Sequence, residues 1–220
     1  PDSNSHREFV LFIREINVHF HRNDQHFQDH DWTDYNADFS LFHGRACPDT
    51  TAPPTGPRRG GGDFARLRYN PHSSVVQGNA NERVLIRMAS LGFQEHSILV
   101  PGIPLTVIGR DAKSMLAGRP AYDSNERGGS PVTRADISNT TNRIDIGPGE
   151  SRDVVFDVPN LALGGKDFLS FPIYDRELGF VKTAANANGD GYGGLRTEAR
   201  LYEKEHLDPQ TYPHQQFDLT

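Results

Sequence analysis

The sequence predicts an all-β chain folded as a Greek-key β-sandwich, and three observations support this prediction. Apolar and polar residues alternate with period two in several short segments, which is typical of strands with one buried side. Glycine (21 residues) and proline (15 residues) separate these segments, as they do in sandwiches built from many short strands. Apolar residues at helical spacing do not persist beyond about two turns. The 220 residues are enough for one large domain with a substantial core.

Charge and composition narrow the classes of function. The net charge is −6 and no large basic block opposes it, so we expect no nucleic-acid partner. No run of roughly 18 apolar residues is present, so we expect no membrane span. The single cysteine, Cys47, excludes an internal disulfide and leaves the redox compartment open. The chain opens on Pro1 without a charged and then apolar leader, which indicates a processed product or a piece of a longer polypeptide.

The first 50 residues are interpreted as N-terminal strands and a polar loop. Residues 9–13 form a continuous apolar run and residues 16–20 alternate, so one or two strands are expected there. Residues 22–38 are polar and aromatic without a clear period, which predicts a long surface loop. Residues 39–42 are a short strand candidate.

The rest of the chain divides into an insertion, a sandwich and a tail. Residues 51–72 are rich in proline and glycine and are interpreted as an exposed insertion or linker. The main sandwich is assigned to residues 73–204 and a C-terminal tail to residues 205–220. Within the sandwich, alternation predicts strands at 84–89, 105–109, 143–146, 152–158 and 195–202. Pro101 and Pro104 interrupt the pair 97–100 and 105–108, so these strands are expected to bend or to lie at a sheet edge.

Four segments, in order, resemble the multicopper oxidase family. Where the family has His-x-x-His-x-His-Gly, residues 96–102 read His-Ser-Ile-Leu-Val-Pro-Gly, so His96 keeps the first ligand position while Leu99 and Pro101 occupy the other two. Residues 42–50 are similar to its Asn-Gly-Arg-x-x-Pro-Asp-Thr segment. Residues 146–154 are similar to its Pro-Gly-Glu/Gln-x-x-Asp-Val turn, and residues 192–198 to its Gly-Gly-Met-x-Thr-Glu closing strand.

This resemblance implies a cupredoxin-like domain in an assembly that oxidises substrates one electron at a time and reduces dioxygen at copper. It does not imply catalysis by this chain. A blue-copper site needs a cysteine thiolate and two imidazoles, and the family supplies that cysteine in His-Cys-His. Here Cys47 lies between Ala46 and Pro48, so it is interpreted as a small packed thiol. Copper is therefore expected in the parent assembly, and none is expected to be bound tightly by this chain.

Three histidines are retained as candidate metal ligands, and no catalytic or cofactor-binding residue is assigned. His96 matches a ligand position of the family, although a hydrogen-bonded histidine near a strand end, with Glu95 as its partner, is the favoured interpretation. His19 and His21 would share one face of a strand, as the two histidines of a metal-binding His-x-His pair do, or would simply form a polar face. Six of the ten histidines lie within the first 43 residues.

Two further segments with acidic residues give weaker indications of a functional site than the histidines do. Residues 186–191 begin like a calcium loop, but Thr197 stands at the position that needs a bidentate glutamate, so a glycine-rich turn is the plainer interpretation. Asp29 and Asp31 lie in a polar segment and are interpreted as solvated carboxylates.

Two functional interpretations follow. In the first, the chain is a copper-free, non-catalytic cupredoxin-like part of a multicopper oxidase, periplasmic or extracellular, packed against other cupredoxin domains of the same polypeptide or oligomer. In the second, it is a secreted copper-free β-sandwich that serves as a binding or structural subunit. The first predicts that Leu99, Val100, Pro101 and Ile103 form an apolar sheet edge covered by loops or by a neighbouring domain.

Overall fold

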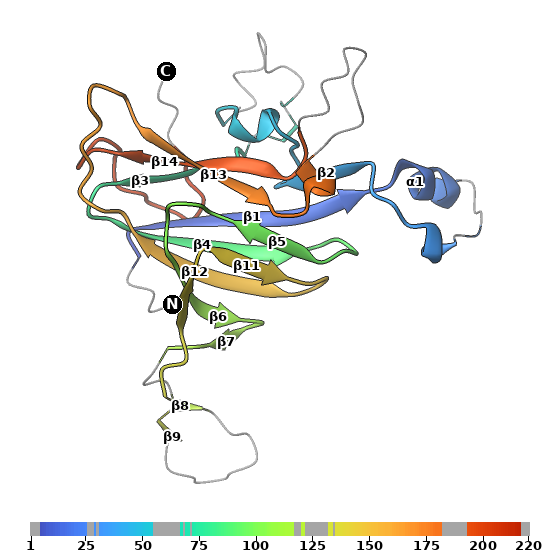
Figure 1. Cartoon of the computed structure of the whole chain (residues 1–220), viewed down its shortest axis with the longest axis horizontal. Coiled ribbons are helices and arrows are strands. Elements are labelled where there is room, and N and C mark those ends of the chain that lie inside the picture. The colour runs from blue at the N-terminus through green and yellow to red at the C-terminus, as the bar shows by residue number, and fades with distance from the viewer. Residues whose placement is uncertain are drawn as a thin grey trace.

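The computed structural model describes residues 5–25, 29, 31–54, 67, 69–70, 72–116, 120–121, 132–133, 135–181 and 193–216. Two β-sheets contain most of the regular secondary structure among these residues, and the α-helix projects from one end of the sheets (Figure 1). The helices of the described part include none long and apolar enough to cross a bilayer. The predicted all-β architecture is confirmed.

The larger sheet has the strand order β10-β6-β12-β4-β1-β2, and β7 extends it by pairing with β6. Strand β1 runs parallel to β4 and antiparallel to β2. Its strands are β1 (Arg7–Ile16), β2 (Phe39–Phe42), β4 (Arg83–Ser90), β6 (Leu105–Arg110), β7 (Lys113–Ser114), β10 (Asn139–Thr141) and β12 (Ser151–Asp157).

The second sheet has the order β11-β5-β13-β14-β3, with β3 parallel to β14. Its strands are β3 (Val76–Asn79), β5 (His96–Leu99), β11 (Arg143–Ile146), β13 (Leu169–Asp175) and β14 (Arg196–Tyr202). A separate ribbon joins β8 (Pro120–Ala121) to β9 (Val132–Thr133). The helical elements are α1 (Val18–Gln25) and the short 3₁₀ segments η1 (Trp32–Asp34), η2 (Asp49–Thr51) and η4 (Leu178–Val181).

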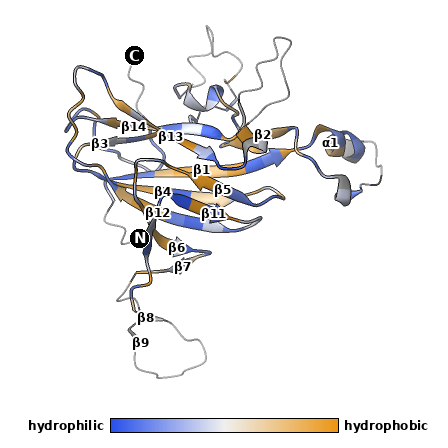
Figure 2. Ribbon diagram, viewed as in Figure 1, coloured by the Kyte–Doolittle hydropathy of each residue, from blue (hydrophilic) through white to orange (hydrophobic). Residues whose placement is uncertain are grey.

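The core lies between the two sheets and follows the alternation seen in the sequence. The apolar positions of β4, β12 and β14 are buried, and the strands appear as mixed apolar and polar ribbons (Figure 2). Residues from both sheets form one apolar cluster, which includes Phe9, Leu11, Ile13, Ile86, Ile98, Val154 and Ile173. The sequence therefore specified which side of these strands faces inward.

The alternating segment at residues 16–20 is not a strand, and this prediction was wrong. Strand β1 continues to Ile16, and α1 begins at Val18. Asn17 starts the helix because its side-chain oxygen accepts the N–H of Phe20 at 2.9 Å. The Asp38 carboxylate accepts the N–H of Val18. Two side chains thus satisfy amide groups of the first helical turn, and this local capping overrides the period-two pattern.

The expected apolar sheet edge is also corrected. Strand β5 lies between β11 and β13, so it is an inner strand. Val100 and Ile103 belong to the core cluster, and Leu99 and Pro101 are half-buried. The domain's own packing buries Val100 and Ile103 and partly covers Leu99 and Pro101.

Strand β13 was not predicted from the sequence because Pro172 interrupts it. Proline cannot donate to a ladder and is rare in central strands. Here β5 pairs only with Tyr174 and Asp175, so the β13 backbone at Pro172 has no partner on the β5 side. That local end of pairing is where a residue without an N–H is tolerated.

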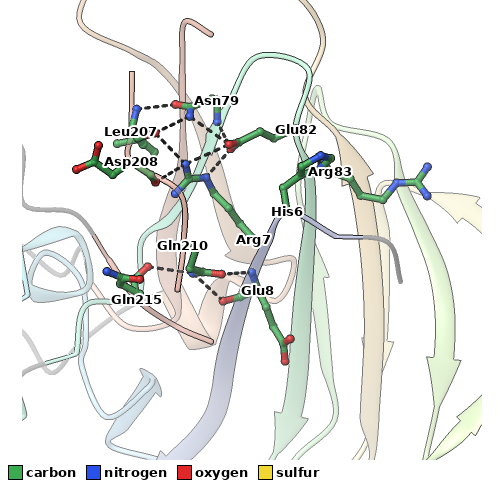
Figure 3. Close-up of polar contacts among 10 residues, drawn as sticks. All are labelled: His6, Arg7, Glu8, Asn79, Glu82, Arg83, Leu207, Asp208, Gln210 and Gln215. Atoms are coloured by element: carbon green, nitrogen blue, oxygen red, sulfur yellow. Dashed lines mark hydrogen bonds and ion pairs between the residues drawn. The ribbon is translucent and has the colours of Figure 1, made fainter. Parts of the chain in front are cut away.

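Strand β1 carries a charged residue at each end of its buried face. Arg7 and Glu15 share the inward register of Phe9, Leu11 and Ile13. The Arg7 guanidinium pairs with Glu82 and donates to the backbone carbonyls of Leu207 and Asp208 at 3.2 and 2.9 Å (Figure 3). One buried cation therefore joins β1 to the start of β4 and to the C-terminal segment.

Replacing Arg7 by alanine should lower the free energy of unfolding by about 3 kcal/mol or more, because Glu82 and two carbonyls lose a buried partner. Arg83→Ala is the matched control: its bidentate pair with Asp157 is exposed, so we expect a loss below about 1 kcal/mol. Urea denaturation measures both. Equal losses would mean that the Arg7 cluster does not support the fold.

Candidate functional site

A buried triad of ionisable side chains joins the two sheets at the end opposite to Arg7. Glu15 comes from β1, His96 begins β5 and Asp175 ends β13. Each occupies the inward register of its strand and is at most 3% exposed. Because β1 belongs to one sheet and the other two strands to the second, His96 links the two layers of the sandwich.

Both ring nitrogens of His96 are engaged by carboxylates. Its Nδ1 lies 2.7 Å from an Asp175 oxygen, and its Nε2 is hydrogen-bonded to Glu15. The other Glu15 oxygen accepts the N–H of Phe93 at 2.8 Å, and the other Asp175 oxygen accepts the N–H of Glu177 at 2.7 Å. Every carboxylate oxygen of the triad thus has a donor, as buried charges require.

The triad stabilises an imidazolium. Burial opposes the charged form of His96, but the hydrogen bonds that His96 donates to Asp175 and Glu15 outweigh it and raise the pKa of His96 to about 9. Burial also opposes ionisation of Glu15, yet its hydrogen bonds with His96 and Phe93 hold the pKa of that carboxyl below its usual value. The unit is therefore a cation between two anions across neutral pH.

Aromatic rings cover Glu15 on the solvent side. The rings of Phe20, Trp32, Tyr35 and Phe93 form a chain of contacts with centroids 5.1 to 5.4 Å apart. They line, with Glu15, a cavity of about 280 Å³. Burial, and then the nearby Glu15 charge, raise the pKa of Tyr35. Residues 22–38, predicted as a long surface loop, thus contain the end of α1 and all of η1, and Trp32 and Tyr35 help to shield the triad.

The structure places the three candidate metal ligands in different settings. His96 has Glu15 and Asp175 as partners, whereas the anticipated partner Glu95 is exposed. His19 and His21 lie on α1 and not on a strand, so residues two apart do not share a face. The assignment of His19 and His21 as metal ligands was motivated by a shared strand face, which the helix does not provide. The assignment stays a prediction. Among the described residues, no three His, Cys, Asp or Glu side chains are grouped to hold a metal ion.

Cys47 has a free thiol, and its backbone forms an isolated β-bridge with Gly194. Its N–H donates to the carbonyl of Gly194 at 3.0 Å, so it connects the segment after β2 to the segment before β14. Burial raises the pKa of the Cys47 thiol, and neighbouring Arg196 and Thr50 only partly oppose this. The sulfur is therefore held as a thiol, and not as the thiolate that binds metals.

A histidine cluster was missed by the sequence analysis because its members are far apart in the chain. His43, His72 and His214 pack with ring centroids 4.5 to 5.7 Å apart. Only the enrichment of histidine near the N-terminus hinted at one member. Residues 186–191, which begin like a calcium loop but were interpreted as a glycine-rich turn, and most of the insertion at 51–72 lie outside the described residues. Asp29 and Asp31 are exposed, and Asp31 caps η1 through Thr33.

The His96 triad predicts a pH dependence of stability. The folded pKa of about 9 exceeds the ordinary value of 6.5, so the stabilisation is complete below pH 6.5 and is lost as pH rises toward 9. The free energy of unfolding should fall by up to ~3 kcal/mol over this interval. Urea denaturation at both ends measures the change. His96→Gln should be less stable and should lack this decline, and a wild-type stability independent of pH would contradict the assignment.

Gly92 is required by the close approach of Glu15. A Cβ at position 92 would lie 1.7 Å from a Glu15 carboxylate oxygen. Gly92→Ala should therefore displace Glu15 from His96 and cost on the order of 2 kcal/mol or more. Gly179→Ala is the control, because its Cβ would meet nothing nearer than 3.9 Å. In a Glu15→Ala background the Gly92→Ala cost should largely vanish, and its persistence there would refute the proposed clash.

Comparison with known proteins identifies the fold. Neither a protein-family model nor a curated protein sequence matches this chain. The structure resembles the blue copper oxidase of Nitrosomonas europaea, with 15% identity and a TM-score of 0.55 over 88% of this chain and 43% of that one. It also resembles the multicopper oxidase mgLAC, with 14% identity and a TM-score of 0.54 over 93% of this chain and 46% of that one.

The chain thus spans less than half the length of the two oxidases that it resembles. At this level of identity the likeness establishes the fold. The protein has an all-β, Greek-key, cupredoxin-like sandwich that resembles the fold of these two oxidases.

Proposed function

We propose that this chain is a copper-free, non-catalytic cupredoxin-like domain or subunit of a multicopper oxidase. In this proposal the coppers that oxidise the substrate and reduce dioxygen are held by other cupredoxin domains, in the same polypeptide or in an oligomer. The assembly is periplasmic or extracellular. This chain contributes packing surface around those domains.

The observation that carries the proposal is the engagement of His96. Copper binds a neutral imidazole through a free ring nitrogen, and both nitrogens of His96 are occupied by buried carboxylates. Freeing one nitrogen would leave Glu15 or Asp175 as an unpaired buried charge. The described residues around His96 therefore do not fit copper, and His96 acts as an ion-paired support between the sheets.

The neighbouring residues agree with this role. Ile98 and Val100 follow His96 into the apolar core, so the strand continues as packing and not as a ligand set. Burial keeps the Cys47 thiol protonated, and the Cys47 backbone N–H bonds Gly194 in a different part of the fold. The second candidate function, a copper-free binding or structural subunit, shares these features and differs only in lacking copper-bearing partners.

The experiment that separates the two is isolation of the native polypeptide followed by mass and copper analysis. The proposal expects copper in a polypeptide or stable complex larger than the 24.5 kDa of this chain. A native 24.5 kDa protein free of copper and of copper-bearing partners would contradict it and would support the structural-subunit alternative.

Substitution of His96 then tests its role within that assembly. His96→Gln should lower the unfolding temperature while the folded fraction keeps the wild-type amount of copper. A copper ligand would behave in the opposite way, with copper lost in proportion to the substitution. His206→Gln, at an exposed histidine, is the control and should change neither measurement.

A further inference from the structure

The β1 edge is completed by side chains of the C-terminal segment (residues 205–216) and not by a strand. Strand β2 pairs only with residues 13–16 of β1. Beyond that point, the N–H of Glu8 donates to the Gln210 side chain at 2.6 Å, and the N–H of Val10 donates to Nδ1 of His214 at 3.1 Å. The backbone N–H of His214 returns a bond to the Glu8 carbonyl at 2.7 Å. Gln210 is drawn against Glu8 in Figure 3.

The bond from Val10 fixes the protonation state of His214. An imidazole nitrogen accepts a hydrogen bond only when it carries no proton, so Nδ1 is bare and Nε2 holds the ring proton. The imidazolium has protons on both nitrogens and accepts none. Protonation of His214 therefore breaks this bond and leaves the Val10 N–H facing the new N–H at Nδ1, so that two donors oppose each other. The same tautomer is unsuited to a metal at Nε2.

The surroundings of His214 also disfavour a positive charge. The His43 ring stacks on it at 4.5 Å, the His72 ring lies 5.5 Å away and the Phe9 ring meets it edge-on at 6.1 Å. On β1, the Glu8 carboxylate is already paired with Arg87 at 2.9 Å. Burial, and then repulsion from His43 and His72, lower the pKa of His214 to about 4, which a backbone interaction with Ser73 only partly offsets.

The pKa of His43 is also lowered. Burial, followed by the neighbouring His72 and Arg45, lowers its pKa. The groups that face the His43–His214 pair are thus one imidazole (His72), one guanidinium (Arg45) and one carboxylate already paired with Arg87 (Glu8). None of these groups is free to compensate a proton on His214.

We propose that His214 is a proton-operated latch that holds the C-terminal segment against the β1 edge at neutral pH and releases it under acid conditions. Release uncovers the N–H groups of Glu8 and Val10 on a strand that then has an open edge.

The sign of the effect follows from linkage. Because the docked pKa lies below the ordinary value of 6.5, docking is fully stable above pH 6.5 and weakens as pH falls toward 4. Between about pH 7.5 and about pH 5, the equilibrium constant for local opening should rise about thirtyfold from His214 alone.

Amide hydrogen exchange of the full chain, corrected for the intrinsic pH dependence of exchange, measures this opening at Val10. We expect about thirtyfold weaker protection of Val10 at the lower pH. The Ile86 and Val154 amides, in the centre of the same sheet, should keep their protection, which shows that the opening is local.

Two variants identify the group responsible. His214→Asn retains a short side-chain acceptor for Val10 but cannot titrate, so the pH response should fall to a few-fold or less. His206→Gln, an exposed histidine of the same segment, should retain the full response. Protection of Val10 that does not change with pH, or a full response in His214→Asn, would overturn the proposal.

Discussion

The pairing of buried His96 with two carboxylates is the interaction that holds the two sheets of this sandwich together at one end. An imidazole that bridges two sheets without solvent needs a partner on each nitrogen, because every orphaned polar atom there costs free energy. Glu15 and Asp175 supply these partners from different sheets. The position of β1 relative to β5 and β13 is thereby fixed, and so is the requirement for glycine at position 92. At the far end of β1, Arg7 imposes an equivalent constraint through Glu82 and the C-terminal segment.

His96, which is buried, and His214, which is half-buried, respond to pH in opposite ways because different groups surround them. His96 lies between anions, so its protonation is favoured, and mild acid leaves the link intact because the pKa of Glu15 is held below its usual value. His214 lies between other imidazoles and accepts a backbone N–H, so protonation is disfavoured. Mild acid therefore weakens the contact of His214 with the edge of the larger sheet and leaves the His96 link between the two sheets intact. Alkaline conditions act on the contact between the layers first.

The sequence predicted what depends on local patterns and missed what depends on tertiary contacts. Strands β4, β12 and β14 were predicted because each alternates with one apolar face. Helix α1 was missed because Asn17 and Asp38 cap it, and the second of these is distant in sequence. His96 was singled out by its resemblance to a ligand position. Its partners at positions 15 and 175 could not be recognised, since nothing local distinguishes a carboxylate that will be buried from one that will be solvated.

A copper site and an ion-paired histidine place different demands on the same strand. A metal centre tolerates a loosely packed neighbourhood because ligand bonds fix the geometry, and its affinity then contributes to folding. Here β5 passes directly from His96 to core packing at Ile98 and Val100, and Glu15 and Asp175 neutralise the imidazolium. The free energy that holds this end of the sandwich therefore comes from burial and charge pairing within the chain. In an oxidase, a domain built in this way would keep its shape whether or not neighbouring domains were loaded with copper, which is the property required of a packing support.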